Sequence, residues 1–246
     1  MNHHLTIITG ASRGMGEAIA AGLVAAGHQV LGISRGRSER LAALGVEQWQ
    51  ADLADPLPVA ERLGAWLAAQ DAGACASVAL INNAGVITPP GPIDGVELAV
   101  LSAALRAGLE ATLLLSSAFL RATRGWAASK RVLNISSGLG RRAMAGSAPY
   151  CAAKAGMDNL SRAIALDEAQ RPNGARVVSL APGVIDTAMQ QELRSGGDAA
   201  GFPDRKVFVA YHEQGLLTSP AEAAARVIAY LGRADFGSKV LADVRD

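Results

Sequence analysis

The stretch "LTIITGASRGMGEAIAAGLVAAG" (5–27) decides the fold. It opens with an apolar run, 5–9, that is typical of a buried strand, and it continues through a glycine-rich turn into an alanine-rich helix that Gly27 ends. Short apolar runs recur along the chain, and longer helical segments separate them. Near-continuous apolar strands that alternate with helices indicate a parallel sheet with both faces covered.

This alternation extends over the whole chain. Strands are expected at 5–9, 29–34, 46–51, 77–82, 131–136, 176–181 and 238–242, and helices at 16–27, 38–44, 57–70, 96–123, 148–170 and 219–232. The order predicts an α/β fold of the Rossmann type, a doubly wound parallel sheet of about seven strands with helices on both faces. No linker or repeat divides it, so residues 1–246 are expected to form one domain; the one long irregular segment, 194–206, is typical of a lid.

Composition narrows the class of protein. The chain is 50% hydrophobic and 18% charged, which suits a large buried core. A net charge of +1 gives no electrostatic basis for binding nucleic acid or an anionic membrane, and no apolar stretch is expected to span a bilayer. Two scattered cysteines and the absence of an export signal favour the cytoplasm. His3 and His4 have no third ligand at metal spacing, so no metal site is expected.

The turn "TGASRGMG" (9–16) carries the first functional signal. Gly10 allows a sharp turn off the strand, Gly14 lets the backbone approach a pyrophosphate, and Gly16 lets the helix pack on the sheet. The free N–H groups at the start of the helix would then face the phosphates. A plain structural turn is the alternative, but the position in the first strand–helix unit favours a dinucleotide site.

The end of the second strand selects the cofactor. Dinucleotide sites for NAD usually place an acidic residue there, whereas this chain reads "SRGRSER", with Ser34, Arg35 and Arg37. A guanidinium can bind a 2′-phosphate that a carboxylate would repel, and Arg13 adds a second positive charge nearby. We therefore expect NADP(H) rather than NAD(H); the alternative is a solvated basic turn.

A tyrosine and a lysine lie four residues apart in "SAPYCAAKAG" (147–156). Tyr150 and Lys154 would lie on one face of the predicted helix, since residues i and i+4 are neighbours there. An ammonium group beside a phenol stabilises the phenolate and is expected to lower the pKa of Tyr150 toward working pH. Such a phenol can pass a proton to or from a reacting oxygen.

Taken together, the motifs resemble those of the single-domain short-chain dehydrogenases/reductases. The resemblance covers essentially the whole chain and rests on "TGASRGMG", "NNAG" (82–85), "NISSGLG", "YCAAK" and "APGVIDT" (181–187), with Ser137 preceding Tyr150 by 13 residues. It implies that Ser137, Tyr150 and Lys154 are catalytic and that Ser137 binds the substrate carbonyl. It also implies that cofactor contacts come from Gly10, Ser12, Arg13, Gly14, Met15, Gly16, Ser34, Arg35, Asp52, Leu53, Asn83, Ala84, Gly85, Tyr150, Lys154, Pro182, Gly183, Val184 and Thr187.

One position departs from the family pattern. An asparagine usually stands in the helix after "NNAG", and its backbone carbonyl holds a water that links the lysine to solvent; here Gly108 occupies that place. Glycine keeps the carbonyl, but without the side chain the local distortion of the helix is expected to differ. A catalytically weakened NADP(H)-binding regulatory protein therefore stays an alternative.

The substrate is a small-molecule carbonyl compound in the leading hypothesis. Within the family, "APGVIDTAMQQELR" (181–194) and "ADVRD" (242–246) resemble sepiapterin reductases and bacterial benzil reductase-like enzymes, which implies an aromatic or vicinal dicarbonyl. The resemblance implies that Asp243 anchors the substrate, although it can also be read as a polar cap of a strand. A lid over 186–215 offers further apolar contacts: Met189, Phe202, Phe208 and Tyr211.

Two further expectations concern partners. A 3-oxoacyl thioester reductase of lipid synthesis is the second enzymatic reading, with Arg141 and Arg142 as a basic patch for an acidic carrier, or else as a solvated loop. The helices at 96–123 and 148–170 carry small-residue faces that permit close helix packing, so a homodimer or homotetramer is expected.

Overall fold

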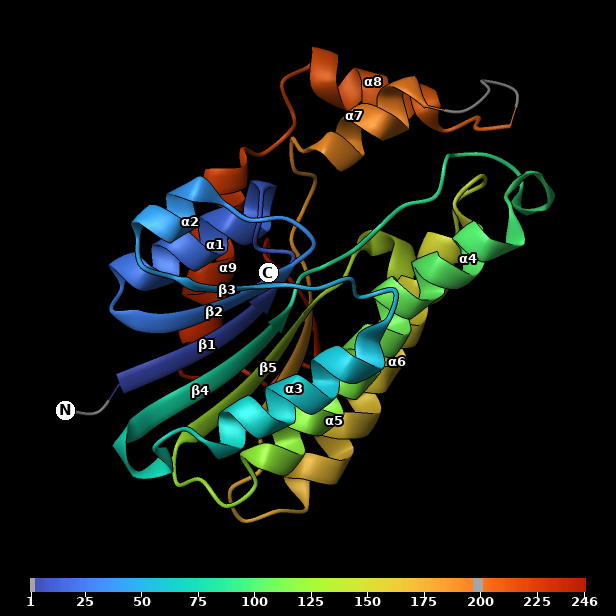
Figure 1. Cartoon of the computed structure of the whole chain (residues 1–246). Helices are drawn as coiled ribbons and strands as arrows, with labels where there is room; N and C mark the ends of the chain where they lie inside the picture. Colours follow the sequence, from blue (N-terminus) through green and yellow to red (C-terminus); the bar gives the residue numbers. More distant parts are fainter. Residues whose placement is uncertain (1–2, 197–200) are drawn as a thin grey trace.

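Seven parallel strands form one sheet in the computed structural model, which describes residues 3–196 and 201–246 (Figure 1). The strands are β1 (His3–Thr9), β2 (His28–Ser34), β3 (Glu47–Gln50), β4 (Cys75–Asn82), β5 (Ser129–Ile135), β6 (Arg176–Ala181) and β7 (Leu241–Asp243). Their order is β3-β2-β1-β4-β5-β6-β7, so the chain starts in the middle, builds outward, and then crosses to the other side of β1. This doubly wound order confirms the predicted Rossmann-type fold.

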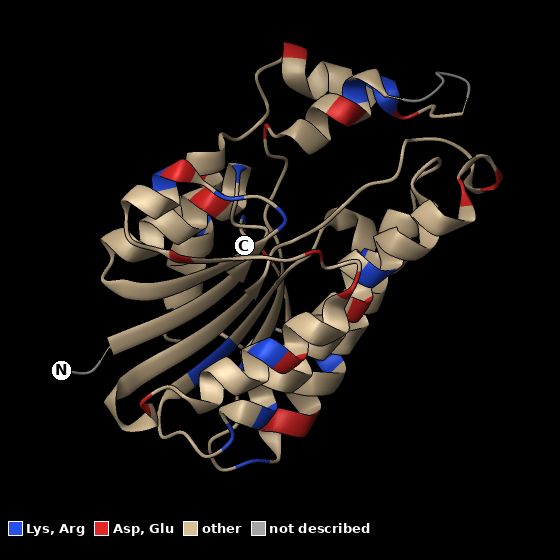
Figure 2. Ribbon diagram, viewed as in Figure 1, with Lys and Arg blue, Asp and Glu red and all other residues tan. Residues whose placement is uncertain are grey.

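Helices cover both faces of the sheet. They are α1 (Gly14–Ala25), α2 (Glu39–Ala43), α3 (Pro56–Ala68), α4 (Leu98–Leu105), α5 (Ala111–Ala122), α6 (Ala148–Ala169), α7 (Ala188–Ser195), α8 (Arg205–Glu213) and α9 (Pro220–Gly232). One apolar core lies between the sheet and α1 and α9, and a second lies between the sheet and α3 and α5. The strands carry little charge, as the tan arrows of Figure 2 show, because both of their faces are buried.

Local signals explain where α9 begins. Ser219 accepts a hydrogen bond from the backbone N–H of Glu222 at 3.2 Å, and the Glu222 carboxylate accepts one from the backbone N–H of Ser219 at 3.2 Å. This capping box satisfies donors that the first helical turn leaves free. The side chains of Ser219 and Glu222 thus fix the start of the helix that "TSPAE" predicts.

The helix predicted at 96–123 is not uniform. It runs as α4, a π-helical turn η3 (Arg106–Glu110), and α5. A π-helical turn adds one residue to the helical ring and often occurs near a functional site. Gly108 lies in the middle of that turn.

The same segment corrects the expectation about membrane spans. Residues Leu98–Ala122 form 25 consecutive helical residues with a mean hydropathy of 1.7 in the most apolar window, which by length and composition suffices to cross a bilayer. Here the segment packs on α3 and α6 in one layer of the fold. Ser, Arg and Glu residues interrupt the apolar run, so the sequence shows no long uninterrupted apolar stretch there.

Two predicted boundaries are also shifted. The last strand pairs with β6 from Leu241 to Asp243, and a turn in which Gly237 has a φ of +91° precedes it. The irregular segment 194–206 is shorter than predicted, since α7 continues to Ser195 and α8 begins at Arg205. Residues 197–200 of that segment lie outside the described residues. The helices α7 and α8 form a lid above the carboxyl ends of the strands (Figure 1).

Candidate active site

The glycine turn after β1 adopts a conformation that requires glycine. Gly10 and Gly14 have φ values of +70° and +60°, in the left-handed region that favours glycine. A Cβ atom on Gly16 would lie 2.2 Å from the carbonyl oxygen of Gly10, so α1 approaches the turn as closely as backbone allows. The first turn of α1 therefore points its free N–H groups into the site.

Residues of the "NNAG" motif hold this turn in place. The side-chain amide of Asn83 donates to the carbonyl oxygens of Thr9 at 2.9 Å and Gly10 at 3.3 Å. The Thr9 hydroxyl accepts from the backbone N–H groups of Asn83 and Ala84, each at 3.0 Å. The Asn83 side chain thus orders the glycine turn, in addition to lining the site as the family resemblance implies.

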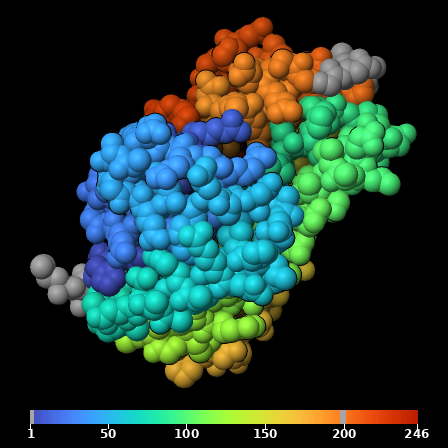
Figure 3. All heavy atoms as spheres, viewed as in Figure 1, coloured from blue at the N-terminus to red at the C-terminus, as the bar shows by residue number. Residues whose placement is uncertain are grey.

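One large cavity of about 1340 Å³ opens along the carboxyl ends of the strands, beneath the lid. A hollow is visible between the orange lid and the blue first third of the chain in Figure 3. All nineteen residues predicted to contact the cofactor line this cavity, as do Ser137 and the predicted substrate residues Met189 and Asp243. Whether they bind a cofactor stays a prediction, but the structure brings them to one place.

The end of the cavity next to β2 is basic. Arg13, Arg35 and Arg37 line it and are exposed, whereas the Ser34 hydroxyl is turned to the carbonyl oxygen of Gly36 at 3.3 Å. No carboxylate stands at the end of β2. The residues present therefore fit the 2′-phosphate of NADP better than the ribose hydroxyl of NAD.

Ser137, Tyr150 and Lys154 line this cavity together. Ser137 follows β5, caps the short helix η4 (Gly138–Gly140) and accepts from the backbone N–H of Leu139 at 3.2 Å. Tyr150 lies in the first turn of α6, and Lys154 lies one turn later. Lys154 is only 3% exposed; its ammonium group donates to the carbonyl oxygen of Ile135 at 2.7 Å and lies 5.7 Å from the centre of the Tyr150 ring.

Burial governs the proton affinities here. Burial lowers the pKa of Lys154 to about 8, and the negative charge of Asp158 opposes that shift. Burial also raises the pKa of Tyr150, while a hydrogen bond with Ser137 opposes the rise. The net shift of the pKa of Tyr150 is therefore opposite to the predicted lowering, because desolvation of the phenolate dominates. Burial thus favours the protonated phenol over the phenolate.

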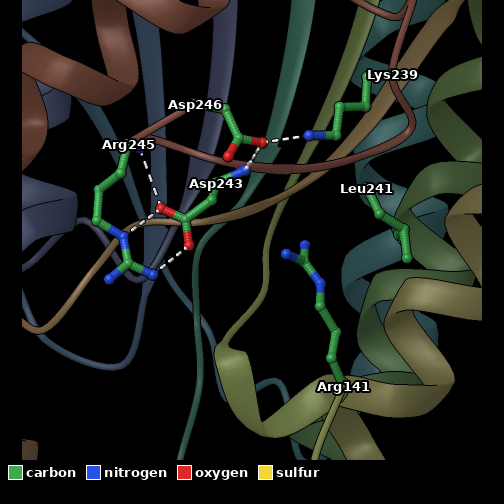
Figure 4. A pocket seen from close by; sticks show the side chains of 6 residues that line it. All are labelled: Arg141, Lys239, Leu241, Asp243, Arg245 and Asp246. Carbon is green, nitrogen blue, oxygen red and sulfur yellow. Dashed lines mark hydrogen bonds and ion pairs between the residues drawn. The ribbon is translucent and has the colours of Figure 1, made fainter.

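The substrate end differs from the prediction at one residue. Phe202 does not line the cavity: it is fully buried and stacks on Phe208, with ring centres 5.8 Å apart, so it supports the lid from behind. Asp243 does face the cavity, but both of its carboxylate oxygens accept hydrogen bonds from Arg245, at 2.7 and 2.6 Å (Figure 4). Arg245 holds the pKa of Asp243 below its usual range. The cavity therefore presents the Asp243–Arg245 ion pair, and not a free carboxylate, to a substrate.

Two charged residues of this region were missed in the sequence. Arg245 lines the cavity beside Asp243, and an acid and a base two residues apart in "ADVRD" would have indicated their pairing. Asp158 lies buried one turn after Lys154, and the spacing 150, 154, 158 was its signal.

The structure gives a physical reason for Gly108. The residue is buried in η3 against α6, and a Cβ atom there would lie 3.0 Å from the Cβ atom of Ala153. Glycine thus allows α6, which carries Tyr150 and Lys154, to pack closely against the π-helical turn. The distortion of the helix is present although the asparagine side chain is not.

The comparisons with known proteins place the chain in a class. Residues 4–198 match the short chain dehydrogenase family, and the chain belongs to that family. It is therefore an oxidoreductase with a nicotinamide-cofactor fold, as the sequence resemblance indicates.

Particular relatives are also similar. A benzil reductase ((S)-benzoin forming) of Bacillus cereus is 34% identical over 87% of this chain and 88% of its own length. Sepiapterin reductase of Rattus norvegicus is 31% identical, covering 98% and 95%. A 3-oxoacyl-[acyl-carrier-protein] reductase of Pseudomonas aeruginosa is 34% identical, covering 77% and 76%.

Solved structures agree with this placement. A short-chain dehydrogenase/reductase from Burkholderia vietnamiensis is 34% identical over 99% of this chain and 98% of its own, with a TM-score of 0.65. An actinorhodin polyketide ketoreductase crystallised with NADPH is 25% identical, covers 99% and 97%, and has a TM-score of 0.75.

Replacing Gly108 with Asn tests the close packing of α6. The added Cβ must displace Ala153, so Gly108→Asn is expected to destabilise the protein by about 1–3 kcal/mol, as overpacking does, and to slow turnover by moving Tyr150. Thermal unfolding and NADPH oxidation measure both effects. Adding Ala153→Gly removes the contact and is expected to restore part of each; wild-type stability of Gly108→Asn alone would contradict this account.

Proposed function

We propose that the protein is an NADPH-dependent carbonyl reductase. The observation that carries this proposal is one cavity with two distinct ends: exposed arginines at β2, and Ser137, Tyr150 and Lys154 beneath the lid. The first end suits the 2′-phosphate of the cofactor. The second suits a carbonyl oxygen that becomes an alkoxide. The family membership supports the reaction class, and the NADPH-bound ketoreductase relative supports the cofactor.

Each residue has a chemical role in this proposal. The nicotinamide, when bound, supplies the hydride to the carbonyl carbon. The hydroxyl of Ser137 donates to the carbonyl oxygen and orients it, and the neutral phenol of Tyr150 transfers its proton to the oxygen as negative charge develops there. The ammonium group of Lys154 stabilises the resulting phenolate. The buried setting that raises the pKa of Tyr150 keeps the proton on the phenol until it is needed.

We further propose that the substrate is a small aromatic or vicinal dicarbonyl compound. The substrate end has apolar side chains on several sides, from Leu139, Met144, Met189 and Phe208. Apolar walls with a few polar groups are typical of small-molecule sites. The likeness to a benzil reductase along most of both chains favours a diketone, whereas the ion pair of Asp243 leaves a polar edge that a pterin would also use.

A 3-oxoacyl thioester is the weaker alternative. Its expected basic patch is reduced to Arg142 at this cavity, because Arg141 does not line it and instead donates to the carbonyl oxygen of Ala242 at 2.8 Å. The regulatory alternative rested on Gly108, whose position is explained by the packing of α6. The decisive experiment follows NADPH absorbance with benzil, sepiapterin and a 3-oxoacyl thioester: diketone or pterin turnover supports the proposal, and cofactor binding without turnover of any substrate contradicts it.

Tyr150→Phe is expected to lower carbonyl reduction about 100- to 10,000-fold, because the proton donor is removed while the ring stays. NADPH binding, measured by fluorescence titration, is expected to persist. Tyr230→Phe is the matched control: Tyr230 lies on α9 and does not line the cavity, so full turnover is expected. Retained turnover in Tyr150→Phe would refute the proposed role.

Arg35→Asp is expected to reverse the cofactor preference. Losing a charged contact to the 2′-phosphate weakens NADPH binding about ten- to a hundredfold, and the new carboxylate suits the ribose hydroxyl of NADH. The ratio of kcat/KM for the two cofactors is the measurement. Arg40→Asp makes the same charge change outside the cavity and should leave the ratio unaltered; an unchanged ratio in Arg35→Asp would remove the case for NADPH.

We also propose a cytoplasmic homodimer or homotetramer that pairs through α5 and α6. Only 28% of the most apolar window in Leu98–Ala122 is buried within the chain, and Leu113 and Leu166 are 46% and 70% exposed. A second copy would cover these leucines, and the small residues of α6 would allow close helix packing.

Leu113→Arg is expected to lower the mass in solution, from dimer to monomer or from tetramer to dimer, because it places a charge in the apolar contact. Light scattering after size exclusion measures the mass. Leu44→Arg, at a leucine of similar exposure (45%) that follows α2 on the opposite side of the sheet, is the control and should keep the oligomer. A monomeric wild type, or one recovered only with membranes, would contradict the proposal.

A further inference from the structure

A buried carboxylate lies behind the proposed catalytic residues. Asp158 is 3% exposed and continues the row of Tyr150 and Lys154 along α6, one turn further on. Its Oδ1 atom accepts hydrogen bonds from the hydroxyls of Ser136 at 2.6 Å and Ser179 at 2.7 Å. Burying a charged group costs free energy unless hydrogen bonds or opposite charges compensate for the lost hydration. A buried carboxylate at this place therefore indicates a specific role.

The hydrogen bonds of Asp158 join three elements of the site. Ser136 directly precedes Ser137 at the end of β5, and Ser179 belongs to β6, so one oxygen atom ties both strands to α6. A Cβ atom on Gly140 would lie 2.9 Å from Asp158 Oδ2 and 2.9 Å from the Lys154 carbonyl oxygen. The turn that carries Ser137 is therefore seated on the part of α6 that carries Lys154 and Asp158.

The second carboxylate oxygen is less well satisfied. Oδ2 is buried and receives no hydrogen bond from the described residues, while the Nε atom of Arg141 faces it at 3.4 Å. Arg141 is shared with the backbone of β7, since it donates to the carbonyl oxygen of Ala242, and Figure 4 shows its side chain reaching toward that strand. A carboxylate matched this loosely still exerts its charge on its surroundings.

Lys154 is a second cation near that charge, one helical turn before Asp158 on α6. On α6 it lies between Tyr150 and Asp158; β5 presents the carbonyl of Ile135, and the segment after β4 presents Gly85, where an added Cβ would lie 3.7 Å from Nζ. Arg141 stands behind Asp158. Among the described residues, Asp158 is the only charged group that shifts the pKa of Lys154 appreciably, and it raises it against the effect of burial.

We propose that Asp158 is a positioning residue for carbonyl reduction: it fixes Ser137 relative to Tyr150, and its charge keeps Lys154 an ammonium. The proposal rests on the proposed function, in which Lys154 acts as a cation. Burial by itself lowers the pKa of Lys154, and a neutral lysine could not stabilise the phenolate. The carboxylate restores the cationic form without occupying the substrate side of the cavity.

Direct titration of Lys154 tests the electrostatic part without any substrate. The chain has only four lysines, so protein labelled with ¹³C at lysine Cε gives four signals, and Lys154→Arg assigns the relevant one. In Asp158→Asn the Lys154 signal is expected to titrate at lower pH than in the wild type. Ser179→Ala is the matched control, since it removes a hydrogen bond to the same carboxylate but leaves the charge. An unchanged titration in Asp158→Asn would overturn the proposal.

The pH dependence of benzil reduction tests the same charge in catalysis. The basic limb, where Lys154 loses its proton, is expected at lower pH in Asp158→Asn and unshifted in Ser179→Ala, together with an about tenfold fall in kcat from looser positioning of Ser137. A purely structural role would lower kcat in both variants and leave the limb in place. If the wild type reduces no dicarbonyl, the proposed function fails, and the lysine titration still decides the role of Asp158.

A second variant covers a failure of Asp158→Asn to fold, which thermal unfolding and NADPH binding would reveal. Arg141→Met removes the cation that faces the carboxylate and leaves Asp158 itself, so Lys154 is expected to titrate at higher pH than in the wild type. A titration at lower or unchanged pH in Arg141→Met would contradict the proposal.

Discussion

The site depends on a set of hydrogen bonds that join the carboxyl ends of β1 and β4. Thr9 and Asn83 join these strands where the chain has crossed from one half of the sheet to the other. This contact holds a glycine turn in which Gly10 and Gly14 occupy left-handed conformations that other residues avoid. The cavity thus forms at the switch point of the sheet, where α/β folds generally place their ligands.

The helix α6 brings Tyr150 and Lys154 to this edge of the sheet. Small residues let it lie close to its neighbours: a Cβ atom on Gly108 would crowd Ala153, and one on Gly156 would lie 2.7 Å from Leu109. Lys154 is buried and Tyr150 is half-buried, and burial favours the neutral form of both groups: it lowers the pKa of Lys154 and raises that of Tyr150. Tyr150 and Lys154 are thereby long polar side chains in the alanine- and glycine-rich first part of this helix.

Much of this was predictable from the sequence, and the exceptions share a cause. Apolar runs and glycine spacing predicted the strands and the first turn, because they report local geometry. The burial of Phe202, the pairing of Asp243 with Arg245 and the raised pKa of Tyr150 depend on what surrounds each group. The family resemblance indicated a distortion of the helix near Gly108, but its form as a π-helical turn packed against Ala153 depends on another helix.

That turn also sets the phase of a helix that has two partners. An α-helix advances about 100° per residue, so one inserted residue rotates everything that follows relative to what precedes. The segment before η3 packs on α6, whereas the segment after it packs mainly on α3. A single continuous α-helix would present one stripe to both neighbours. The π-helical turn therefore rotates α5 about the helix axis relative to α4. Deleting a residue there would turn the leucines of α5 away from the faces they now occupy.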